Sequence, residues 1–147
     1  MKKTIPKPPE PINLQQLFAK PAEVIADLVT IDINNLEEDM VNHPRLVAWA
    51  TVTYENTRAL AEAAKWDVEY MTSQAYHELF AKEGMSIGKA EKLVGSDIKV
   101  TNQQKKHQAL RRQVVVLRAL VTALDHRKDM IVQIAARQRQ EISSYNA

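Results

Sequence analysis

Residues 44–82 read PRLVAWATVTYENTRALAEAAKWDVEYMTSQAYHELFAK, and their apolar spacing decides the fold. One set of positions recurs every seven residues: Val47, Tyr54, Ala61, Val68 and Ala75. A second set fills the complementary heptad position, at Ala50, Thr57, Ala64 and Met71, and Leu79 follows with a slip of one residue. Such a seam is typical of a helix that packs along its length on another helix. We therefore expect a long helix from about Pro44 to Lys82.

A second amphipathic segment runs from about Thr101 to Ile142 and carries two apolar stripes. The first consists of Leu110, Val114, Leu117, Val121, Leu124, Ile131, Ala135, Gln138 and Ile142, with Lys128 as an interruption. The second, about 130° around the helix, consists of Val116, Leu120, Ala123, Met130 and Ile134. A helix that is apolar on two faces must be covered on two sides. The first long helix can cover one stripe. We expect the second stripe to form an interface with another subunit, with cover by the N-terminal elements as the alternative.

Shorter elements flank the two long helices. Residues 1–33 are expected to form a Pro-rich, partly disordered arm with short helical stretches at 14–20 and 21–29, followed by a helical domain at 34–147. A capping-box pattern at 34–37 predicts a short helix to Val41, and Pro44 suits the first position of the next helix, capped by Asn42 or His43. Gly84 and Gly95 are expected to end helices. The predicted fold is all-α: an antiparallel hairpin of long helices with short flanking helices.

Charge is divided unevenly along the chain. Residues 1–81 hold 7 Lys+Arg and 12 Asp+Glu, a net of −5, whereas residues 82–147 hold 13 and 6, a net of +7; together they give the +2 of the whole chain. An acidic half and a basic half favour a binding or assembly protein with a polyanionic partner. The absence of Cys excludes disulfides and thiolate sites. No apolar run has the length of a membrane span or a signal peptide, so we expect no membrane and a cytoplasmic location.

The basic charge concentrates on the first half of the second long helix. No acidic residue occurs between Lys99 and Arg118, and this stretch spans roughly 30 Å as a helix. Such a run fits a phosphate backbone, although a solvated helix face is the simpler interpretation of the run alone. Aromatic residues on the other long helix (Trp66, Tyr70, Tyr76) are interpreted as seam packing rather than as stacking platforms for bases. The candidate nucleic-acid-binding residues are Lys99, Lys105, Lys106, Arg111, Arg112 and Arg118.

No catalytic motif is present, and we expect neither an enzyme nor a cofactor. The four His residues are far apart in sequence, form no metal-ligand motif and are interpreted as surface or cap residues. The stretch Gly84–Ala90 resembles a phosphate loop, but it has three residues between its glycines instead of four, and Ala90 where magnesium needs Ser or Thr. Glu37, Glu38 and Asp39 suit the start of a helix.

The chain resembles the phage UvsY family of recombination mediators over about residues 42–142. The resemblance rests on HPRLVAW at 43–49, ELFAK at 78–82, GKAEKLV at 88–94, SDIKV at 96–100 and ALDHRKDMI at 123–131. It implies an all-helical oligomer that binds single-stranded DNA, contacts a single-strand-binding protein and loads a RecA-like recombinase. A well-studied member carries a Lys-x-Arg cluster late in its first long helix. The corresponding stretch here, 66–76, has Asp67 and Glu69 but no Lys or Arg, so that site is not carried over.

The sequence therefore predicts a recombination mediator that binds single-stranded DNA and helps to load a recombinase in the bacterial host cytoplasm, if the chain is phage-encoded. Its expected partners are single-stranded DNA, a RecA-like recombinase, a single-strand-binding protein and further copies of itself. The alternative is a helical-hairpin adaptor or scaffolding protein without nucleic-acid binding.

Overall fold

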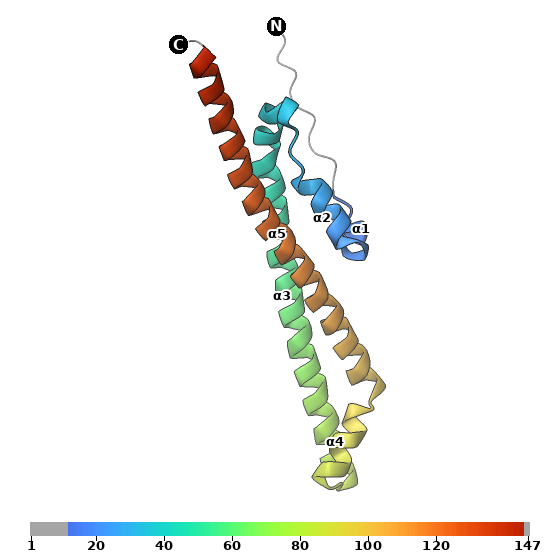
Figure 1. Cartoon of the computed structure of the whole chain (residues 1–147). Helices are drawn as coiled ribbons and strands as arrows, with labels where there is room; N and C mark the ends of the chain where they lie inside the picture. The colour runs from blue at the N-terminus through green and yellow to red at the C-terminus, as the bar shows by residue number, and fades with distance from the viewer. Residues whose placement is uncertain (1–11, 146–147) are drawn as a thin grey trace, which may run out of the picture. The chain divides into compact units, whose positions relative to one another are not determined.

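The computed structural model describes residues 12–145, with Lys82 and Glu83 described by their backbone only. The helical elements are α1 (Leu14–Ala19), α2 (Pro21–Val29), the 3-10 turn η1 (Ile33–Asn35), α3 (Leu36–Glu83), α4 (Ile87–Gly95) and α5 (Ile98–Tyr145). The described residues contain no strand, so the predicted all-α class is confirmed. The two long helices, α3 and α5, have 48 residues each and are joined through α4 (Figure 1).

Local capping explains most of the boundaries. The Asn13 side chain accepts the backbone N–H groups of Gln15 and Gln16 and starts α1, and Pro21 occupies the first turn of α2. Asp97 starts α5 in the same way, because its Oδ1 accepts the N–H groups of Lys99 and Val100 at 2.7 and 3.3 Å. The predicted stop at Gly84 is confirmed, since Gly84 follows α3 with a φ of +57°.

The predicted break before Pro44 is wrong. No separate short helix precedes Pro44, and neither Asn42 nor His43 caps a new one, because α3 runs unbroken from Leu36 with Pro44 in its interior. An interior proline removes one helical hydrogen bond and costs about 3 kcal/mol. Tertiary contacts on the turn before Pro44 hold the helix together instead, and they involve the buried Arg127.

The chain divides into two compact units. Unit 1 contains the residues up to Tyr54 and those from Val116 onward, and unit 2 is Glu55–Val115. The long helices therefore contribute to both. The N-terminal helices α1 and α2 belong to unit 1. Both lie within residues 1–33, the segment that was expected to form an arm separate from the helical domain. The rest of the expected Pro-rich arm, residues 1–11, lies outside the described residues.

The core of unit 1 draws on three helices. Leu17 of α1, Ala50 of α3 and Leu117, Leu120 and Leu124 of α5 are buried together. Half-buried side chains packed on this cluster include Phe18, Val24, Ile25, Leu28, Val47 and Val116. The second stripe of α5 was expected to be covered either by another subunit or by the N-terminal elements of the same chain. Val116 and Leu120 are covered by the same chain. Leu120 is 0% exposed within a single chain, so it is unavailable to a second subunit.

The buried side chains of unit 2 are small. Ala61 and Ala64 of α3, Ala90 and Val94 of α4 and Val100 of α5 are its buried apolar residues. The pKa of Tyr76 on α3 is raised, first by partial removal from solvent and then by the Glu91 carboxylate of α4. Small residues along a helix seam leave room for the facing backbone to approach closely.

Arg127 is the one buried cation among the described residues, and it joins three segments of unit 1. Its Nη2 donates to Asp39 Oδ1 at 2.5 Å and to the Thr30 carbonyl at 3.1 Å, and its Nη1 lies 3.0 Å from His43 Nδ1. The second oxygen of Asp39 accepts the backbone N–H of Asp32 at 2.7 Å. Asp39 and His43 lie one turn apart on α3, just before Pro44, so the guanidinium clamps the helix where proline weakens it.

His43 is buried, which corrects its interpretation as a surface or cap residue. A guanidinium can only donate, so His43 Nδ1 accepts and the ring is neutral. The pKa of His43 is lowered, first by burial and then by Arg127; Lys128 adds to this, while Asp125 and Asp39 oppose it.

We expect truncation of Leu120 to destabilise the monomer. Leu120→Ala should lower the free energy of unfolding by about 2–5 kcal/mol, because it removes buried methyl groups and leaves a cavity between three helices. The matched control is Val115→Ala, where the side chain is 68% exposed and the expected change is within about 0.5 kcal/mol. Urea unfolding followed by circular dichroism measures both. If the two substitutions lowered the free energy of unfolding equally, the burial of Leu120 by helices of its own chain would be contradicted.

We also expect stability to fall on mild acidification. A folded-state pKa below the unfolded value of about 6.5 means that the unfolded chain binds the proton first. The contribution of His43 is therefore fully present above pH 6.5 and is lost as the pH falls toward the folded-state pKa. His43→Asn, which keeps an acceptor but does not titrate, should flatten the dependence of the urea midpoint on pH between 5 and 7.5. His126→Asn, at an exposed position, should leave the pH dependence of the urea midpoint unchanged. If His43→Asn kept the pH dependence of the wild type, His43 would not be the residue responsible for it.

Candidate nucleic-acid interface

The first half of α5 presents basic side chains to solvent. Lys99, Lys105, Lys106, Arg111 and Arg112 are all exposed on unit 2, and Arg118 is exposed on the same helix in unit 1. Within residues 12–145, none of these six side chains forms an ion pair or a hydrogen bond. Their charge is therefore not neutralised by the part of the protein that the structure describes. We call Lys99, Lys105, Lys106, Arg111 and Arg112 the basic run.

Two cations of α3 in unit 2, Arg58 and Lys65, are paired instead. Arg58 lies 3.4 Å from Glu55 and 3.8 Å from Glu62, and Lys65 lies 3.7 Å from Glu69. These are exposed pairs within one helix, of a kind worth only a few tenths of a kcal/mol each. They nonetheless cancel the local field, whereas the basic run has no acidic neighbour in sequence between Asp97 and Asp125. One carboxylate of α3 reaches this part of α5, because Asp67 Oδ2 accepts a hydrogen bond from Gln103 Nε2 at 3.2 Å, but no acidic side chain pairs with the basic run itself.

The start of α5 combines a capping carboxylate with the first residue of the basic run. The partial positive charge of a helix lies at its N-terminus, where acidic side chains normally favour the helix and basic ones do not. The first turn of α5 contains no acidic residue and includes Lys99. Asp97 satisfies the first free N–H groups as a cap. The Asp97 carboxylate also offsets part of the positive end of the helix, so the excess positive charge near the start of α5 comes from the basic side chains.

The basic run does not form a single row. Lys99 and Lys106 share one side of α5, and Lys105 and Arg112 share another about 100° away, each pair separated by seven residues or about 10 Å along the axis. Arg111 lies on a third side. Arg111 and Arg112 line a shallow depression with Gln108 and Val115. A straight duplex could contact only some of these side chains, because they point in different directions around α5. A flexible single strand can bend around the helix and contact more of them.

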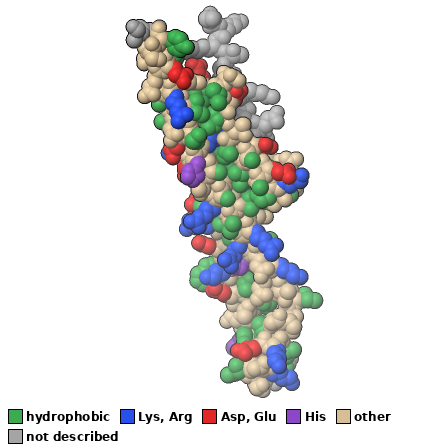
Figure 2. All heavy atoms as spheres, viewed as in Figure 1, with side chains coloured by type: hydrophobic (Ala, Val, Ile, Leu, Met, Phe, Trp, Pro, Cys, Tyr) green, Lys and Arg blue, Asp and Glu red, His purple; other side chains and the backbone are tan. Residues whose placement is uncertain are grey.

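The surface holds exposed aromatic residues as well. Trp66 and Tyr70 on α3 are 69% and 64% exposed, so their interpretation as seam packing is wrong. Tyr76 is half-buried, and its ring stacks on Phe80 at a centroid distance of 6.4 Å. Apolar side chains reach the surface among the charged ones in Figure 2. By helical position, Trp66 and Tyr70 lie on the side of α3 opposite to its packed seam, and Glu62 and Glu69 lie beside them, so they do not extend the basic run.

Comparison with known protein families, curated proteins and solved structures finds no match to this chain. The described residues hold no group of three His, Asp or Glu side chains that could bind a metal ion. No helix among residues 12–145 combines the length and apolar character needed to cross a bilayer. Sequence reasoning named the six candidate residues on the first half of α5, but it missed the roles of Arg127 and Asp39.

The contrast between buried and exposed arginines gives a prediction. Arg127→Ala should cost about 3–5 kcal/mol of unfolding free energy, because it leaves Asp39 and His43 without their partner. Arg111→Ala with Arg112→Ala should change stability by no more than about 1 kcal/mol, since both side chains are solvated. Chemical unfolding of the three proteins in one buffer is the measurement. A double substitution as damaging as Arg127→Ala would show that the basic run supports the fold.

Proposed function

We propose that the protein binds single-stranded DNA through the basic run of α5, with Arg118 contributing farther along the same helix. The observation that carries this proposal is the unpaired, exposed charge of five side chains within fourteen residues that contain no acid. Arg58, Lys65 and Arg127, by contrast, each pair with a carboxylate of the same chain. Charge left unpaired on a solvent-facing helix is available to release counterions from a polyanion.

Recombination mediation is the specific role that we propose for this binding. It is supported by the resemblance to the UvsY family over residues 42–142 and by the confirmed all-α hairpin. In this role the protein would weaken the hold of a single-strand-binding protein on the strand and help a RecA-like recombinase to nucleate. Self-association would raise the number of basic runs per strand, so that many weak contacts act together.

The second candidate is a helical-hairpin adaptor or scaffolding protein without nucleic-acid binding. The observation that favours it is the group of exposed apolar residues on the long helices, such as Trp66 and Val115, which suit protein contacts. Binding to DNA separates the two candidates, because an adaptor has no reason to show salt-dependent affinity for a strand.

We expect oligo(dT) affinity to fall steeply with salt. If four or five phosphates are neutralised per chain, the slope of log affinity against log salt is about −3, at roughly −0.7 per phosphate. Arg111→Ala with Arg112→Ala should flatten the slope by about 1 to 1.5. The matched control is Arg58→Ala with Lys65→Ala, which removes two cations that are already paired on α3 and should leave the slope unchanged.

Fluorescence anisotropy with a labelled oligo(dT) between about 50 and 200 mM salt gives these slopes. No binding at the lowest salt, or an unchanged slope in the Arg111/Arg112 variant, would contradict the interface. Mediation is tested separately, by recombinase ATP hydrolysis on strands coated with single-strand-binding protein. If the protein binds DNA but does not shorten the lag before ATP hydrolysis begins, the DNA interface stands and the mediator role is rejected.

A further inference from the structure

Two further lysines lie just before the basic run, on α4. Lys92 is in the last turn of α4 and Lys99 is in the first turn of α5, and only Ser96 and Asp97 separate the two helices. Lys89 lies one turn before Lys92 (Figure 1). Both lysines of α4 are exposed, and neither forms an ion pair or a hydrogen bond within the described residues. They therefore share the two properties that define the basic run.

The lysines of α4 lie away from its packed side, which is marked by the buried Ala90 and Val94. At about 100° per residue, Lys92 is about 160° from each of these two residues, and Lys89 is about 60° from Lys92. Gly88 lies about 40° from Lys92, and a Cβ added to Gly88 would meet nothing within 4 Å. Packing therefore does not require the glycine, and the bare backbone beside Lys92 can be approached closely by a ligand.

The acidic residues of this segment have partners of their own. Between Lys89 and Lys99 the acidic residues are Glu91 and Asp97. The Tyr76 hydroxyl of α3 donates a hydrogen bond to the Glu91 carboxylate. Asp97 accepts the first free N–H groups of α5 as its cap. Because neither carboxylate pairs with a lysine of α4, the positive charge of α4 remains open to an external anion.

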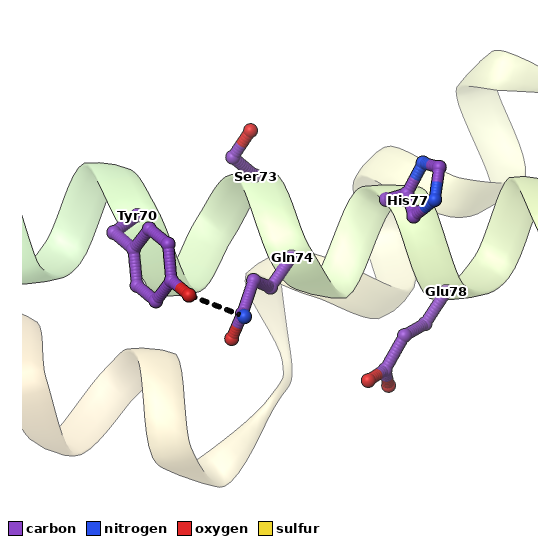
Figure 3. A pocket seen from close by; sticks show the side chains of 5 residues that line it. All are labelled: Tyr70, Ser73, Gln74, His77 and Glu78. Carbon is purple, nitrogen blue, oxygen red and sulfur yellow. Dashed lines mark hydrogen bonds between the residues drawn. The ribbon is translucent and has the colours of Figure 1, made fainter.

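The neighbouring part of α3 offers no cations to an anion. Residues 66–81 contain three acidic residues and no Lys or Arg. The exposed side chains there are hydrogen-bonded polar groups, as in the bond of 2.7 Å that Gln74 Nε2 donates to the Tyr70 hydroxyl. Figure 3 shows the shallow depression that these two residues line together with Ser73, His77 and Glu78. A strand that passes beyond Lys99 therefore finds cations on α4 and not on this part of α3.

We propose that single-stranded DNA bound to the basic run continues over α4 and contacts Lys89 and Lys92, so that the site spans two helices of unit 2. This inference rests on the proposed DNA binding and extends the same site. The nine residues of α4 add about 13 Å of helix to the roughly 20 Å between Lys99 and Arg112. A lysine ammonium is a mobile point charge, which suits contacts to phosphates that carry no sequence information.

Removal of both lysines tests the extension. Lys89→Ala with Lys92→Ala should lower the slope of log oligo(dT) affinity against log salt by about 1 to 1.5, at roughly 0.7 per phosphate. The loss of affinity between about 50 and 200 mM salt then becomes about four- to eightfold smaller than in the wild type. Lys89→Arg with Lys92→Arg keeps the charge and should keep the wild-type slope. Circular dichroism verifies that the variants keep their helicity.

The matched control removes the same charge elsewhere. Lys128→Ala with Arg137→Ala changes two exposed positions of α5 in unit 1 and should leave the slope unchanged. Contact is separated from a long-range effect of charge by brief acetylation of the wild-type protein with and without oligo(dT). Lys89 and Lys92 should become several-fold less reactive when the strand is bound, as Lys99 should.

The outcomes distinguish this extension from the DNA binding on which it rests. A wild-type slope in the Lys89/Lys92 variant, or full reactivity of both lysines while Lys99 is protected, would overturn the extension and leave the basic run as the whole site. An equal loss of slope in the Lys128/Arg137 control would also overturn it, because the effect would then follow net charge and not contact. If the wild type does not bind oligo(dT) at the lowest salt, the proposed function and the extension both fail.

Discussion

The buried guanidinium of Arg127 is the constraint on which unit 1 depends. Burying a charge is costly unless partners surround it, so the segment after α2, the start of α3 and the second half of α5 have to meet at one place. Thr30, Asp39 and His43 supply the acceptors. The same contacts lie on the turn before Pro44, where α3 continues without a break, and they tie the segment after α2 to α5 in the unit where Leu17 and Leu120 share a core. A single cation thus fixes the register of three segments.

The treatment of charge differs between the two units, and the proposed function follows from that difference. In unit 1, Arg127 is buried and fully paired. In unit 2, Arg58 and Lys65 of α3 pair with glutamates of the same helix, whereas the cations of α5 do not pair within the described residues. The core of unit 2 relies on alanines, so it gains less from apolar burial than the leucine cluster of unit 1. Unpaired basic charge on this part of the hairpin is easier to explain by a polyanionic ligand than by a contribution to stability.

Periodicity predicted most of the fold. The heptad positions of both long segments lie mainly at buried or half-buried places, and Gly84, Pro21 and the α4 region fall near the predicted boundaries, because spacing and capping are local properties. The break at Pro44 was wrong, since the contacts that override the proline come from Arg127, 83 residues away in sequence. The exposure of Trp66 was not predicted, because spacing alone allows an aromatic residue of an amphipathic helix to lie on either the packed face or the exposed face. The basic residues were found from composition, but only the structure distinguishes unpaired Arg111 from buried Arg127.

The most direct test of the account is lysine footprinting of the intact protein. Brief acetylation with and without oligo(dT), read by mass spectrometry, reports whether a strand covers each amine. We expect Lys99, Lys105 and Lys106 to become several-fold less reactive in the presence of the strand. Lys65 and Lys128, whose side chains are 63% and 61% exposed, should keep their reactivity. Uniform protection of all five lysines, or protection of Lys65 and Lys128 alone, would contradict a polyanion site on the first half of α5.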